Sequence, residues 1–126
     1  MIQKYTARAA ACLEIVVGIT LILVPGFACQ LLFAAPLTGD GVPIARFAGI
    51  GLLSLGIAYW STRTTSDPRG SILGLLVFNL VTAVLLTWVG VTASFHGILL
   101  WPAVLLHGGI GAALIWQFIR GSPLAA

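Results

Sequence analysis

The chain has 126 residues, of which 60% are hydrophobic and 7% are charged, and six Lys and Arg against three Asp and Glu give a net charge of +3. Soluble domains average about 45–50% apolar and about 25% charged residues, so this composition excludes an ordinary soluble fold. The basic residues are scattered along the chain, which argues against nucleic-acid binding. We expect a single transmembrane domain over residues 1–126.

Four long apolar runs follow one another, and we expect each to form a membrane-spanning helix. Their expected bounds are about 5–24, 42–60, 70–91 and 98–119. Each is close to the length of about 20 residues that a helix needs to cross a bilayer, and none alternates in polarity as a barrel strand does. The segment from Phe27 to Phe33 is apolar but too short to span, so we expect a short interfacial helix in the first outer loop. The predicted fold class is an all-α integral membrane four-helix bundle.

The basic residues also indicate how the helices are oriented. If the helices alternate in direction, Arg46 falls toward one side of the membrane and all other basic residues fall on the opposite side: Lys4, Arg8, Arg63, Arg69 and Arg120. Positive charges favour the cytoplasmic side, so both termini are expected in the cytoplasm. Tyr and Trp residues near the expected span ends agree with this frame. We expect a multi-pass protein of the bacterial inner membrane.

Strongly polar residues lie near the middle of three predicted helices. At 1.5 Å per residue, Glu14 and Asn79 lie about 13–14 Å from the inner end, and His107, counted from the outer end, reaches a similar depth. A polar group in hydrocarbon needs a partner inside the protein, so we expect these side chains to meet. Arg46 enters from the outer side with its Cα roughly 9 Å above Glu14, which puts a Glu14–Arg46 ion pair within side-chain reach.

Small residues share the helix faces of the polar ones, as Gly18 does with Glu14, Ala83 with Asn79, and Gly111 with His107. Small side chains let helix backbones approach closely, so the polar face is expected to be the packing face. Large residues of the last two helices are then expected to face lipid or an oligomer partner: Leu75, Leu76, Leu85, Leu86, Leu105 and Leu114.

Two interpretations of Glu14, Arg46, Asn79 and His107 remain open. In the first they only hold the helices together; in the second they form a ligand-binding or proton-exchanging site, because intramembrane ionisable groups often mark such sites. The sequence shows no nucleophile motif, phosphate-binding loop or metal-ligand spacing. No catalytic residue, metal site or cofactor is therefore predicted, an enzyme is the less favoured class, and a lipid or a quinone is the bound molecule we consider.

Two segments resemble small four-helix bacterial membrane proteins of the DoxX-like kind: Ala45 to Ala58 (ARFAGIGLLSLGIA) and Gly97 to His107 (GILLWPAVLLH). The resemblance implies an inner-membrane four-helix bundle with Arg46, Asn79 and His107 as recurring polar positions. Our functional prediction is a small accessory or binding subunit that forms a homo-oligomer or joins a larger membrane complex. The alternatives are a proton-coupled transporter that uses Glu14 and His107, and a redox-partner protein with a quinone near His107.

Overall fold

The computed structural model describes residues 2–64, 69–93 and 96–120, and for residues 2–4 only the backbone. These residues form five helices, α1 (Ile2–Leu23), α2 (Pro25–Phe33), α3 (Gly41–Thr62), α4 (Arg69–Thr92) and α5 (Leu100–Arg120). All except α2 are long and apolar enough to cross a membrane. At 1.5 Å per residue they measure about 31–36 Å, against about 30 Å for the hydrocarbon core of a bilayer. The predicted all-α fold with four candidate spans is confirmed.

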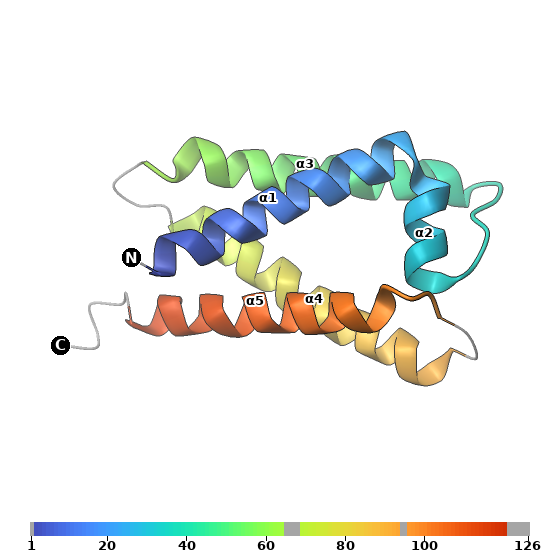
Figure 1. The fold of residues 1–126 in the computed structure, drawn as a ribbon. Helices are drawn as coiled ribbons and strands as arrows, with labels where there is room; N and C mark the ends of the chain where they lie inside the picture. The colour runs from blue at the N-terminus through green and yellow to red at the C-terminus, as the bar shows by residue number, and fades with distance from the viewer. Residues whose placement is uncertain (1, 65–68, 94–95, 121–126) are drawn as a thin grey trace.

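The short helix α2 lies across one end of the bundle instead of continuing α1 (Figure 1). It begins at Pro25, a residue suited to the first helical position because its missing N–H would have no partner there. It ends before Ala34, which adopts a left-handed φ of 51°. The carbonyls of Leu32 and Leu31 accept hydrogen bonds from the backbone N–H groups of Gly97 (2.9 Å) and Leu99 (3.0 Å). Helix α2 is thereby attached to the connection between α4 and α5.

The long helices form two closely packed pairs, α1 with α3 and α4 with α5 (Figure 1). Glycines allow the first pair to approach closely: a Cβ placed on Gly49 would lie 2.7 Å from the carbonyl oxygen of Gly18, and one on Gly56 would lie 2.8 Å from that of Ala11. Contacts between the two pairs are far fewer, and those of α1 with α5 are among them. The two pairs are therefore packed less closely against each other than the helices within each pair.

The packed core lies toward the end of the bundle where α1 begins and α5 ends. Its members are small residues of α1 and larger residues of the other long helices: Ala7, Ala10, Ala11, Tyr59, Leu75, Leu76 and Leu114. The expectation that the large leucines lie on the outside, toward lipid or an oligomer partner, agrees with the exposure of Leu85 and Leu105, which is 54% and 75%. It is wrong for the other four, Leu75, Leu76, Leu86 and Leu114, which are 0–9% exposed. Three of these leucines belong to the same core cluster as the alanines of α1, so small faces and large faces pack together.

The outer surface of the long helices is strongly apolar. Phe47 and Leu105 are among many large hydrophobic side chains that lie mostly outside the fold, at 77% and 75% exposed. Water-soluble monomers rarely expose continuous apolar surfaces of this kind. Together with the helix lengths, this surface identifies a multi-pass membrane protein.

Candidate functional site

Glu14, Asn79 and His107 meet inside the bundle, one each from α1, α4 and α5. The amide nitrogen Nδ2 of Asn79 donates to Oε1 of Glu14 at 3.2 Å, and the amide oxygen Oδ1 of Asn79 lies 2.8 Å from Nδ1 of His107. All three side chains are 0–9% exposed. The structure therefore brings these three residues together as predicted, and Asn79 is the central member.

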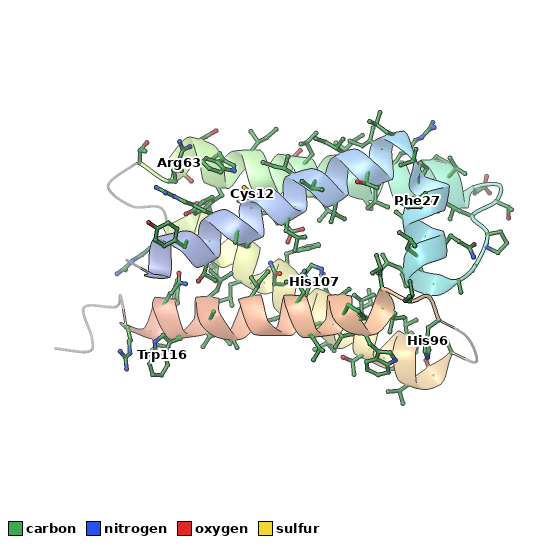
Figure 2. All side chains as sticks on the ribbon, in the orientation of Figure 1. Cys12, Phe27, Arg63, His96, His107 and Trp116 are labelled. Carbon is green, nitrogen blue, oxygen red and sulfur yellow. The ribbon has the colours of Figure 1, made fainter. Side chains whose placement is uncertain are left out.

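The surroundings hold this group in place. Asn79 lies on the buried face of α4, one turn after Leu75, and its Nδ2 also donates to the carbonyl oxygen of Leu75 at 2.8 Å. The ring of Phe78 packs edge-on against the ring of His107, with centroids 5.9 Å apart. Figure 2 shows His107 on the side of α5 that faces the other helices. The amide and the imidazole are thus both fixed by neighbours on α4.

Arg46 does not join this group. Its side chain is exposed on α3, and no ion pair links it to Glu14 in the part of the chain that the structure describes. Ala45, Gly49 and Leu52 belong to the packing face of α3, and Arg46, one residue after Ala45, is turned away from that face by about 100°. The prediction that Glu14 and Arg46 could form an ion pair is wrong. It rested on the depths of the two residues alone, whereas Arg46 lies on the exposed face of α3.

Glu14 keeps one oxygen without a partner. Oε2 is fully buried and accepts or donates no hydrogen bond within the described residues. A buried polar atom of this kind costs about 1–3 kcal/mol when it remains unpaired. Such an atom calls for an explanation, and one explanation is a further molecule beside it.

A partly open cavity of about 420 Å³ adjoins this group. Side chains of α1 and α5 form two of its walls, α4 lies behind it, and α2 covers one end through Phe27, Ala28, Leu31 and Leu32. Its lining is almost wholly apolar, and Glu14 and His107 are its ionisable members. The volume is within the range of about 300–1,000 Å³ that is typical of small-molecule sites.

The cavity and the packed core occupy opposite halves of the bundle. The core uses Ala7 to Ala11 of α1, whereas the cavity uses Leu13 to Leu21 of the same helix. Glu14 therefore lies where the core ends and the cavity begins. A ligand that enters with its polar group foremost would meet Glu14 and His107 at the inner end of an apolar chamber.

This cavity was not predicted from the sequence. The apolar run from Phe27 to Phe33 predicted a short helix, but a helix lying in the interface has no reason to line a cavity. What brings α2 over the chamber is its pair of backbone hydrogen bonds to the connection before α5, a tertiary contact without a sequence signature. Phe27 and Leu31 were therefore missed as site residues.

In the described ranges, no three His, Cys, Asp or Glu side chains gather closely enough to hold a metal ion. Comparisons with known protein families, characterised proteins and solved structures found no match. The argument for function consequently depends on the site itself: a buried hydrogen-bonded group, an unpaired carboxyl oxygen and the chamber next to them.

Proposed function

We propose that this protein is a small membrane-embedded binding subunit that takes an amphipathic membrane molecule into the chamber between its two helix pairs. The observation that carries the proposal is Glu14, which lines a partly open apolar cavity and has a buried Oε2 without a partner among the described residues. A ligand with an apolar body and a small polar head matches both features. The proposed role is that of a binding or accessory protein, with an enzyme as the less favoured class.

Native mass spectrometry of the protein in its native membrane lipids tests this proposal. The expected result is a bound species that Ala103→Phe removes, because Ala103 lines the cavity and a phenyl ring there would fill part of it. Ala112→Phe is the matched control, since Ala112 lies on the same helix but on its exposed surface. Equal retention of the bound species by both variants, or its absence from the unmodified protein, would refute the proposal.

The proposed orientation places both termini in the cytoplasm of a bacterial cell and α2 in the outer interface. Arg63 and Arg120 support it, because both lie at the end of the bundle opposite α2 and stack on Trp60 and Trp116 at 4.1 and 3.9 Å. Arg is enriched on the cytoplasmic side, and Trp is enriched at both membrane interfaces, so the arginines give the side and the tryptophans the depth.

Two cysteines introduced into a chain without Cys12 and Cys29 test the orientation. Thr38 and Thr64 are exposed in the connections at the two ends of the bundle. A membrane-impermeant maleimide should label Thr38→Cys in intact spheroplasts and Thr64→Cys only after permeabilisation. The reverse pattern would invert the topology.

A binding subunit is expected to deliver its ligand to a partner, so we propose assembly as a homo-oligomer or within a larger membrane complex. The DoxX-like resemblance of the segments that begin at Ala45 and Gly97 is in keeping with such a role. Cross-linking in membranes followed by purification in mild detergent should give a species larger than the monomer. A strictly monomeric protein without a co-purified partner would remove this part of the proposal.

A proton-coupled carrier is the second candidate, and one observation favours it: two ionisable groups, Glu14 and His107, line the same cavity. The amide of Asn79 stands between them and does not readily pass a proton. Proton exchange would therefore need a molecule in the chamber. Proton flux into proteoliposomes that is unchanged by Glu14→Gln would exclude this function.

A further inference from the structure

The hydrogen-bond directions around Asn79 are determined by chemistry. The carbonyl oxygen of Leu75 can only accept, so the amide atom 2.8 Å from it must be the donor Nδ2. The amide oxygen Oδ1 then faces His107, and since this oxygen can only accept, Nδ1 of His107 must carry a hydrogen. A neutral imidazole protonated at Nδ1 has an acceptor lone pair at Nε2.

The second ring nitrogen of His107, Nε2, belongs to a residue that lines the cavity. His107 lines the chamber, and in the described part of the chain the one hydrogen bond of its ring is that of Nδ1 to Asn79. Nε2 is not among the fully buried unpaired polar atoms of the described residues, so it keeps some access to the chamber, whereas Oε2 of Glu14 is fully buried and meets a ligand only when the Glu14 carboxyl group turns toward the cavity that it lines. Helix α5 therefore provides a hydrogen-bond acceptor, Nε2 of His107, at the chamber.

Glu14 offers the complementary group. Its Oε1 accepts from Asn79 Nδ2, so a proton on the neutral acid belongs on Oε2. The neutral acid is the form that suits this position, because Glu14 is 0% exposed and no cationic side chain pairs with it among the residues described. An isolated ionised carboxylate inside a membrane protein is strongly disfavoured. Glu14 of α1 thus provides a hydrogen-bond donor for a ligand in the chamber, and His107 of α5 provides an acceptor.

A hydroxyl group satisfies both atoms at once, because it accepts one hydrogen bond and donates another. A carbonyl or an ether accepts from Glu14 but leaves Nε2 of His107 unpaired. A phosphate or quaternary ammonium head would bring an uncompensated charge into a chamber whose walls are apolar. The hydrogen-bond pattern therefore selects among the amphipathic molecules that the chamber could accept.

We propose that the ligand is an uncharged lipid alcohol whose hydroxyl group bridges Oε2 of Glu14 and Nε2 of His107, with its hydrocarbon body in the chamber beneath α2. This inference rests on the proposed binding function and adds the chemistry of the head group. Long-chain alcohols and diacylglycerols share that chemistry. Asn79 acts as the positioning residue, since its amide orients both bridging groups without touching the ligand.

Direct binding to the purified protein in detergent tests the head group with three tritiated probes: 1-hexadecanol, hexadecyl methyl ether and hexadecane. The ether retains the acceptor and loses the donor, so it should bind about tenfold more weakly than the alcohol. Hexadecane should bind no better than the ether. Equal binding of all three would overturn the head-group inference while the binding function stands, and no binding by any probe would overturn both.

Three variants test the residues. In His107→Leu the preference for alcohol over ether should disappear, because the acceptor is gone; this ratio does not depend on how much of the variant folds. Glu14→Leu removes the donor and should weaken hexadecanol binding about tenfold, and Glu14→Gln, which retains an N–H donor, should recover part of that loss. A preference for the alcohol that persists in His107→Leu would refute the bridge, as would palmitic acid binding more tightly than the alcohol to the unmodified protein.

Comparison of free hexadecanol with a short-chain diacylglycerol separates the two sources of a hydroxyl head. The cavity of about 420 Å³ is open on one side, so one acyl chain can lie inside while a second remains in lipid. Both probes should lose their preference over the corresponding methyl ether in His107→Leu. A diacylglycerol that binds without such a preference would limit the site to single-chain alcohols.

Discussion

Replacing Asn79 by Leu should destabilise the protein by more than any other change of one buried polar side chain. The side chain makes hydrogen bonds to Glu14 and His107 on two other helices and to Leu75 on its own. Hydrogen bonds between membrane helices average about 0.6 kcal/mol, and a buried group left unpaired costs about 1–3 kcal/mol. Because both Glu14 and His107 lose their partner, we expect a loss of between about 1 and 4 kcal/mol in the free energy of unfolding.

Reversible unfolding in mixed micelles, followed by circular dichroism, measures this loss. Thr87→Val on the same helix is the matched control, because Thr87 is exposed and its hydroxyl donates only to the carbonyl of Ala83 one turn earlier. We expect the control to change stability by less than about 0.5 kcal/mol. A double-mutant cycle of Asn79→Leu with Glu14→Leu should give a coupling energy of about 0.5–3 kcal/mol, the range for residues in one network. A zero coupling energy, or a loss no larger than that of the control, would refute the account of Asn79 as the central member.

Two glycine substitutions test the helix contacts, each against a glycine with open space around it. Gly49→Ala puts a methyl group 2.7 Å from the carbonyl oxygen of Gly18 and should cost about 1–3 kcal/mol of unfolding free energy. Gly51→Ala, with nothing within 4 Å of the added methyl group, should be neutral or stabilising. Equal effects of the two substitutions would contradict the close α1–α3 packing. Gly97→Ala puts a methyl group against the backbone of α2 and should detach that helix, which is measured as faster amide hydrogen exchange in α2. Gly26→Ala, with open space around it, should leave the exchange in α2 unchanged. Unchanged exchange in both variants would show that α2 is held by other contacts.

The polar centre was predictable because two simple rules apply to it without knowledge of the tertiary structure. A polar side chain in a span needs a partner, and the rise per residue gives its depth. Glu14, Asn79 and His107 satisfied both rules and do meet. Arg46 satisfied the depth rule but lies on another face of its helix, and that face depends on how Gly18 and Gly49 pack.

The distribution of large residues was less predictable. Small residues on the faces of the polar ones suggested that bulky residues would be excluded from the interior, yet Leu75 and Leu114 belong to one core cluster with Ala7 and Ala11. Close packing is reached by the facing side chains of an interface together, so small residues on one helix can be matched by large residues on another. A sequence pattern read helix by helix cannot show which small face meets which large one, so the core and the cavity beside it appear only in three dimensions.

The two interpretations of the polar residues, structural support and working site, apply to different atoms of one group. Asn79 uses its amide hydrogens and its oxygen in hydrogen bonds within the protein, so it supports the bundle. Glu14 and His107, which line the chamber, each use one atom for that support and have a second polar atom without a partner among the described residues. Had support been the sole role, an apolar residue packed at either position would remove the cost of an unpaired atom. The retained pair of polar atoms is therefore the strongest reason to look for a ligand there.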